Sequence, residues 1–181
     1  FNTGESKSLV IGGLKRIMQE LIANQVPAIT ITGGEPFLKK NELSALLTLA
    51  SAANIHASIN SNFSLIDEKM VNFLLKCKNV TLLGSLLSAD SDEYEILSNT
   101  PPGSFENVLY RISSAINAGL SVGINMVITK ENIGSMMATA QLAKKIGARS
   151  FCATRVLPNI NLDHFEILSN DILLESLDNL I

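Results

Sequence analysis

The chain alternates between short runs of apolar, mostly β-branched residues and longer stretches in which apolar residues recur every three or four positions. Runs of the first kind predict buried strands, and stretches of the second kind predict amphipathic helices. Five strands are predicted in this way, over residues 28–32, 55–60, 79–87, 121–129 and 149–157. Helices are predicted around them over residues 8–25, 41–53, 70–77, 104–116 and 133–146, and a last helical segment over 170–181.

The predicted helix ends carry residues that tolerate a left-handed backbone, and a strand follows each of them directly. These residues are Asn54, Asn79, Gly119 and Gly147. At the other end of two helices, Asn41 and Ser104 are expected to act as N-caps. Short connections from helix to strand indicate parallel strands joined by right-handed crossovers. The strands look apolar on both faces, which predicts a sheet covered on both sides.

This alternation of predicted strands and helices places the chain in the α/β class, as a single unit without an internal domain boundary. The chain has 181 residues, whereas a closed eight-stranded barrel needs about 250. The pattern fits a partial (β/α) barrel or an open doubly wound sheet, and alternation alone leaves both open. We assign the βα units to residues 1–158 and a trailing helical segment to residues 159–181.

The net charge, the lengths of the apolar stretches and the cysteine count limit which classes of function fit the sequence. The net charge is -3 and there is no basic run, which argues against nucleic-acid binding. No apolar stretch reaches the ~20 residues that span a bilayer, so we expect no membrane segment. Two cysteines, Cys77 and Cys152, lie far apart and are expected to be reduced thiols of a cytoplasmic protein. Two thiols cannot supply the three or four ligands of an iron–sulfur cluster.

Polar and glycine residues gather where the predicted strands end, which is the functional edge of parallel α/β folds. After the first strand, Gly33 and Gly34 allow a ligand or another backbone to approach closely. Glu35 then offers a carboxylate at the strand mouth, and Pro36 stiffens the turn. A carboxylate beside backbone carbonyls is suited to binding an amine.

The run from Thr30 to Leu38, TITGGEPFL, resembles the GGEP motif of radical S-adenosylmethionine (SAM) enzymes. The resemblance implies that Gly33, Gly34, Glu35 and Pro36 lie against the amino group of SAM. It continues at INSNF (59–63), where many members have Thr-Asn-Gly, so that Ser61 becomes a candidate cofactor residue and Phe63 replaces the glycine. It continues again at SLLS (85–88), where many members have Ser-Leu-Asp-Gly, so that Ser85 becomes a candidate and Leu87 replaces the aspartate.

Three later runs extend the resemblance to residue 158. The run PGSF (102–105) matches the family's turn into the next helix. The run GINMVIT (123–129) matches the strand whose asparagine, here Asn125, faces the cofactor. The run RVLP (155–158) matches the last strand, and it adds Arg155 and Leu157 to the candidate cofactor residues, near the adenine end.

The resemblance implies a partial barrel truncated at its N-terminus. Family members carry a CxxxCxxC loop that binds a [4Fe–4S] cluster, and this loop is absent from the sequence. We expect it upstream of Phe1, so the chain alone is expected to be inactive. The full-length enzyme is expected to cleave SAM reductively to a 5′-deoxyadenosyl radical, with a flavodoxin or ferredoxin as electron donor.

A peptide is the expected substrate. The alternative is a catalytically dead barrel that serves as a peptide-binding or scaffold module. A phosphate-binding (β/α) enzyme is a third hypothesis, but it requires a glycine loop at a helix N-terminus near the last strands. Gly103 and Gly119 do not form such a loop.

Overall fold

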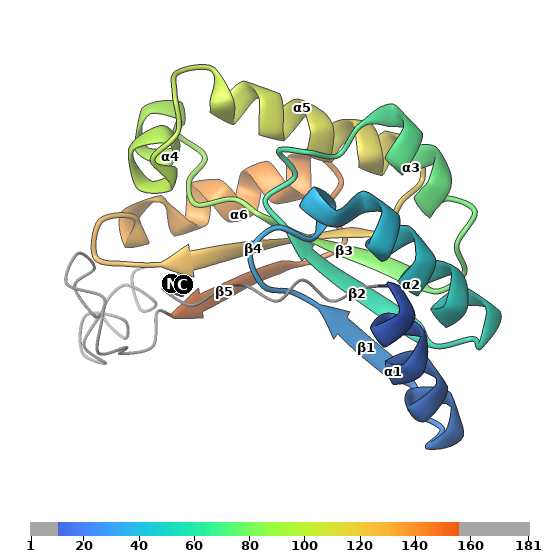
Figure 1. The fold of residues 1–181 in the computed structure, drawn as a ribbon. Coiled ribbons are helices and arrows are strands. Elements are labelled where there is room, and N and C mark those ends of the chain that lie inside the picture. Colours follow the sequence, from blue (N-terminus) through green and yellow to red (C-terminus); the bar gives the residue numbers. More distant parts are fainter. Residues whose placement is uncertain (1–10, 156–181) are drawn as a thin grey trace.

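A computed structural model describes residues 11–155, in which strands and helices alternate along the chain (Figure 1). The strands are β1 (Ala28–Ile31), β2 (His56–Ser61), β3 (Val80–Ser85), β4 (Val122–Ile128) and β5 (Phe151–Arg155). The helices are α1 (Ile11–Ala23), α2 (Lys40–Ala52), α3 (Glu68–Leu74), α4 (Ser91–Ser98), α5 (Ser104–Asn117) and α6 (Met136–Lys145), with 3₁₀ turns η1 (Pro36–Lys39) and η2 (Ile133–Ser135). The predicted Leu157 site and the segment 159–181 lie outside the described residues.

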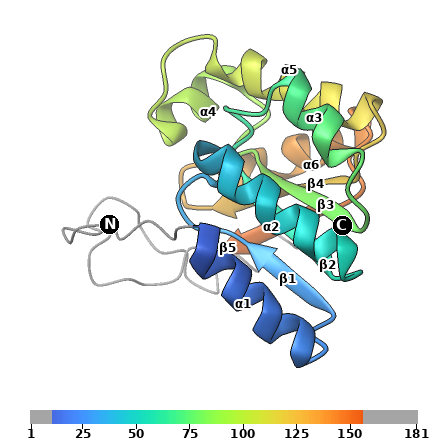
Figure 2. The ribbon, with the colours of Figure 1, turned by 45° about the vertical axis from the view of Figure 1, so that its right-hand side comes forward.

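The five strands form one parallel sheet in the order β1-β2-β3-β4-β5. The sheet curls, and the helices lie along its outer side (Figures 1 and 2). A doubly wound sheet would reverse its strand order and carry helices on both faces. The consecutive order and the single helical layer therefore identify a partial (β/α) barrel, the first of the two predicted architectures.

The two faces of the sheet differ within the described residues, and the prediction that both faces are apolar was wrong. In β2, Ala57 and Ile59 are fully buried in the core, whereas the alternating Ser58 and Asn60 are only partly buried. Side chains on a strand alternate between faces. Among the described elements one helical layer buries one face, and the inner face of the curl keeps polar residues.

The core lies between the sheet and the helices. Leu47 of α2, Leu74 of α3 and Ile112 of α5 pack in one buried cluster with Ile59 and Ile124 of the strands. Each of these side chains is at most 1% exposed. Full burial of one such side chain contributes about 1.5–3 kcal/mol, so this layer fixes where the strand ends and their loops lie.

The predicted left-handed helix ends are confirmed, with φ of 57° at Asn54, 54° at Asn79, 102° at Gly119 and 83° at Gly147. The two predicted N-caps were wrong. Turn η1 leads directly into α2, whose N-cap is Lys39, and Asn41 is its second residue. Gly103, at φ 86°, is the N-cap of α5, and Ser104 is its first residue.

Helix α4 was not predicted, because the segment after β3 was expected to be a long connection. Asp90 caps it by accepting a hydrogen bond from the Glu93 amide at 2.9 Å. Tyr94 packs its ring on Phe105 of α5, with ring centroids 5.6 Å apart. Asn99 ends the helix in the left-handed conformation. Helix α4 is thus fixed by capping and by one aromatic contact.

No helix within residues 11–155 is both long and apolar enough to span a lipid bilayer.

Candidate functional site

The ends of the parallel strands surround a hollow of about 250 Å³ on the inner side of the sheet. Its lining residues come from the loop after β1, the end of β2 and the loop that follows it, β3, and the middle of β4: Thr32, Gly34, Asn60, Ser61, Asn62, Leu83, Ser85 and Asn125. Four of them, Gly34, Ser61, Ser85 and Asn125, are predicted cofactor residues. The fold therefore brings together predicted cofactor residues that lie far apart in the sequence, by 91 positions for Gly34 and Asn125.

Glu35 follows two glycines with positive φ, 97° at Gly33 and 51° at Gly34. Its carboxylate turns back to cap η1, and Oε1 accepts the Phe37 amide at 3.0 Å. The same Oε1 accepts the Ser61 hydroxyl at 2.9 Å, and Oε2 accepts the Asn62 amide at 2.9 Å. The carboxylate therefore ties the loop after β1 to the end of β2, and it bonds two residues that line the hollow, Ser61 and Asn62. Glu35 and Gly33 are not themselves among the lining residues.

Ser61 is buried at 3% exposure, although it was predicted as a cofactor contact. Its Oγ donates to Glu35 and accepts the Phe63 amide at 2.9 Å. Phe63 has φ 62°, a conformation that favours glycine, and its ring is 0% exposed. A Cβ added at Gly84 would lie 2.9 Å from this ring. Phe63 thus keeps the backbone of the family's glycine while its side chain fills space that Gly84 leaves open.

The far side of the hollow is formed by β3 and β4, where Ser85 pairs in register with Asn125. Asn125 Oδ1 accepts the Thr154 hydroxyl of β5 at 2.6 Å. Arg155 pairs in register with Ile128, and it does not line the hollow. Asn125 is therefore held toward the hollow from β5, whereas Arg155 lies farther along the strands.

Pro36 also does not line this hollow. It is the first residue of η1 and borders a neighbouring hollow with Leu14 and Leu43. Four residues of the strand-end hollow were not predicted: Thr32, Asn60, Asn62 and Leu83. The alternation of side chains along a strand could have identified Asn60, since it lies two positions before the quoted Asn62.

A buried asparagine that was not singled out as a site residue braces this edge of the sheet. Asn132 is 1% exposed, and its Nδ2 donates to the carbonyls of Leu87 and Val127, both at 2.9 Å. Its Oδ1 accepts the Thr129 amide at 2.8 Å. Asn132 therefore joins the loop after β3 to the end of β4, beside the strand residues that line the hollow.

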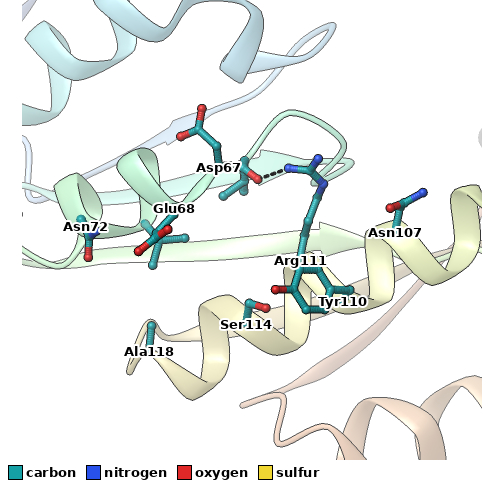
Figure 3. A pocket seen from close by; sticks show the side chains of 10 residues that line it. Asp67, Glu68, Asn72, Asn107, Tyr110, Arg111, Ser114 and Ala118 are labelled. Carbon is teal, nitrogen blue, oxygen red and sulfur yellow. Dashed lines mark hydrogen bonds between the residues drawn. The ribbon is translucent and has the colours of Figure 1, made fainter.

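A larger hollow, about 490 Å³, lies between α3 and α5 (Figure 3). Arg111 crosses it to donate to the Ile66 carbonyl, and Asp67 lies on the opposite wall (Figure 3). The hydrogen bond from Lys40 lowers the pKa of Asp67, and the Met70 amide adds to this effect. None of the predicted cofactor residues borders this hollow, so it is separate from the strand-end site.

The described residues offer no ligand set for an iron–sulfur cluster. In residues 11–155 no three His, Cys, Asp or Glu side chains gather as a metal-binding group. Burial raises the pKa of the Cys77 thiol, which favours its neutral form. Cys152 is exposed on β5, and both cysteines are free thiols. Ligands for a cluster are therefore not found within this part of the chain.

Comparisons with known proteins agree on one family. The model of the radical SAM superfamily matches residues 2–143. A probable GTP 3′,8-cyclase of Methanosarcina mazei is 31% identical over 115 residues, which are 63% of this chain and 34% of that protein. The mycofactocin maturase MftC of Mycobacterium tuberculosis is 28% identical over 146 residues, 80% of this chain and 36% of that protein.

Solved structures share the fold. SuiB of Streptococcus suis, bound to S-adenosylmethionine, superposes with a TM-score of 0.84 at 21% identity, over 99% of this chain and 41% of that one. SuiB bound to the precursor peptide SuiA gives a TM-score of 0.83 at 21% identity, over 99% of this chain and 40% of that one. The chain spans only about a third to two fifths of the length of these relatives.

Proposed function

Because this chain belongs to the radical SAM superfamily, we propose that it forms the SAM-binding part of an enzyme that cleaves SAM reductively and modifies a peptide. The observation that carries the proposal is the Glu35 carboxylate, which three hydrogen bonds hold against Ser61 and Asn62, two residues that line the strand-end hollow. The family implies SAM and a [4Fe–4S] cluster. The substrate and the residue roles are our inference.

Glu35 is suited to the ammonium of SAM's methionine part. A carboxylate has about four acceptor positions, and the chain itself uses two on Oε1 and one on Oε2. The remaining position on Oε2 is available to a charged donor. Gly33 and Gly34 carry no side chain, so they let the ligand approach the backbone.

Asn125 and Ser85 provide hydrogen-bonding groups on the opposite side of the hollow. We propose that they contact the nucleoside part of SAM, with Arg155 and Leu157 nearer its adenine end. The Thr154 hydroxyl occupies Asn125 Oδ1, which leaves the amide hydrogens of Asn125 to donate to the ligand. The two sides of the hollow thus offer an acceptor to the ammonium and donors to oxygen atoms.

In this family the [4Fe–4S] cluster supplies the electron that cleaves SAM. Its ligands are not among residues 11–155, and we propose that they belong to the rest of the protein, as the family's CxxxCxxC loop. A flavodoxin or ferredoxin would deliver the electron in the cytoplasm, where thiols such as Cys77 and Cys152 remain reduced.

A peptide substrate is supported by two observations. The inner face of the partial barrel carries polar side chains such as Ser58 and Asn60, and an open half-barrel admits an extended chain. SuiB, which shares the fold, has been crystallised with its precursor peptide. Donors and acceptors along strand edges suit peptide recognition.

The alternative remains a catalytically dead barrel that binds a peptide as a scaffold. Iron analysis of the intact protein after anaerobic reconstitution separates the two. Stoichiometric iron supports the enzyme, and its absence supports the scaffold.

The SAM site is tested by Glu35→Gln in the intact protein, measured by equilibrium binding of SAM. Hydrogen bonds to charged groups contribute about 1.5–3 kcal/mol, so affinity should fall about tenfold or more. Glu106→Gln, on the exposed side of α5, is the matched control and should bind SAM like the wild type. Unchanged affinity in Glu35→Gln would show that the carboxylate does not bind SAM.

The substrate is tested by incubating the reconstituted protein with SAM, a reductant and the peptides encoded beside its gene. We expect a mass change in one peptide together with 5′-deoxyadenosine. Turnover with a small metabolite alone would exclude the peptide while leaving the family chemistry intact.

A further inference from the structure

The hydrogen bonds around Ser61 have only one possible direction. The Phe63 amide can only donate, so Ser61 Oγ accepts from it at 2.9 Å. The Glu35 carboxylate, when ionised, can only accept, so the Ser61 hydroxyl hydrogen points to Oε1 at 2.9 Å. The direction of both hydrogen bonds, from the Phe63 amide to Ser61 Oγ and from the Ser61 hydroxyl to Glu35, therefore follows from the donors and acceptors alone.

This arrangement leaves Ser61 little to offer a ligand. Its single hydrogen is committed to Glu35, and the residue is 3% exposed. From it we infer that Ser61 is a positioning residue that acts on SAM through Glu35, rather than one that contacts SAM. The inference rests on the proposed function, and it reassigns a residue that the family resemblance had placed among the cofactor contacts.

Positioning matters because the glutamate side chain has three rotatable bonds. The Phe37 amide belongs to the same turn as Glu35, whereas the donors from Ser61 and Asn62 come from the end of β2 and the loop beyond it, 26 and 27 positions away. Without the Ser61 hydroxyl, Oε1 keeps only its local donor. The carboxylate is then held by two donors instead of three, the Phe37 amide on Oε1 and the Asn62 amide on Oε2. An ammonium at Oε2 loses part of its preorganised acceptor.

A double-mutant cycle on the intact protein tests the inference, with SAM affinity as the measurement. Ser61→Ala should weaken SAM binding about fivefold to tenfold, as expected for one hydrogen bond. In a Glu35→Gln background the same change should alter affinity by less than about twofold, since the group through which Ser61 acts has lost its charge. Ser113→Ala, on helix α5 and away from the strand ends, is the matched control and should bind SAM like the wild type.

The conservative variant Ser61→Thr keeps the hydroxyl, and many family members have threonine here. It should stay within about twofold of the wild-type affinity. Equal losses from Ser61→Ala in both backgrounds would overturn the inference and indicate direct contact with SAM. If the wild type binds SAM and Glu35→Gln binds it equally well, the assignment of Glu35 fails instead, and the inference fails with it.

Amide hydrogen exchange provides a readout that needs no SAM. Ser61→Ala removes the acceptor of the Phe63 amide, so exchange at Phe63 should accelerate, whereas Ser61→Thr should leave it protected. Unchanged protection at Phe63 in Ser61→Ala would contradict the hydrogen-bond chain itself. If exchange at Phe63 accelerates in Ser61→Ala as expected but the wild type does not bind SAM, the proposed function fails while the hydrogen bonds around Ser61 stand.

Discussion

At the scale of single residues, Phe63 combines a strained backbone conformation with a side chain whose burial stabilises the fold. A left-handed φ of 62° is strained for a bulky residue, by about 1–3 kcal/mol. The ring is fully buried beside Gly84 and in the main core cluster. Loss of a buried phenylalanine ring costs about 3–5 kcal/mol, so burial outweighs the strain.

The first prediction is therefore that Phe63→Gly destabilises the protein, although glycine prefers this backbone. We expect the free energy of unfolding to fall by about 2 kcal/mol, because the lost ring costs about 4 kcal/mol and the relief of strain returns about 2 kcal/mol. Urea denaturation followed by circular dichroism measures it. Asn99→Gly is the control, because Asn99 shares the left-handed backbone at φ 51° but is exposed. The stability of Asn99→Gly should stay near that of the wild type. If Phe63→Gly is as stable as the wild type, burial of the ring does not outweigh the backbone strain.

At the scale of elements, the start of α3 depends on one carboxylate with two tasks. Asp67 Oδ1 accepts the Met70 amide at 2.8 Å as the N-cap. Its Oδ2 forms an ion pair with Lys40 of α2 at 2.5 Å. The side chains of this pair are 39% and 47% exposed, so the ion pair contributes under about 1 kcal/mol.

The second prediction concerns pH. Because the pKa of Asp67 is lowered in the folded protein, chiefly by the bond from Lys40, its contribution is complete above the unfolded value of about 3.9. The contribution is lost as the pH falls through the lower folded pKa. Asp67→Asn retains a capping oxygen and should be slightly less stable than the wild type at pH 6. This difference should shrink as the pH falls below about 3.9 and through the lower folded pKa.

Asp67→Ala separates the two tasks, since it removes the cap as well. It should cost about 1 kcal/mol more than Asp67→Asn. Denaturant unfolding of the three proteins at several pH values measures both effects. A difference between wild type and Asp67→Asn that persists at low pH would exclude the ion pair as its source.

At the scale of the whole molecule, β1 is an edge strand of the described sheet and pairs with β2 alone. An uncovered edge offers unpaired amides and carbonyls to another chain. The third prediction is that the chain of residues 1–181 forms dimers or larger species as its concentration rises. Light scattering measures this directly.

Thr30→Lys is the matched variant, because Thr30 lies in β1 and is exposed. A charge on an edge strand opposes strand addition, so this variant should be monomeric under conditions where the wild type associates. A wild type that stays monomeric at high concentration would contradict the open edge.

Features that depend on neighbours along the chain could be predicted without the structure. Apolar periodicity located the five strands, and residues such as Asn54 and Gly147 marked helix ends, because turn and helix chemistry acts over a few positions. The GGEP run identified the loop after β1 for the same reason. Helix α4 was missed because it has only eight residues and is marked in the sequence by its N-cap Asp90 rather than by apolar periodicity.

The tertiary structure was needed to distinguish a partial barrel from a doubly wound sheet, because the two folds share the same local alternation and differ in which face the helices cover. It also decided that the inner face is polar and that η1, rather than a cap at Asn41, begins the second helical segment. Above all, it showed that the Ser61 hydroxyl donates a hydrogen bond to Glu35, a partner 26 positions away. Such a pairing arises from strand register and loop closure across the sheet, which no local pattern encodes.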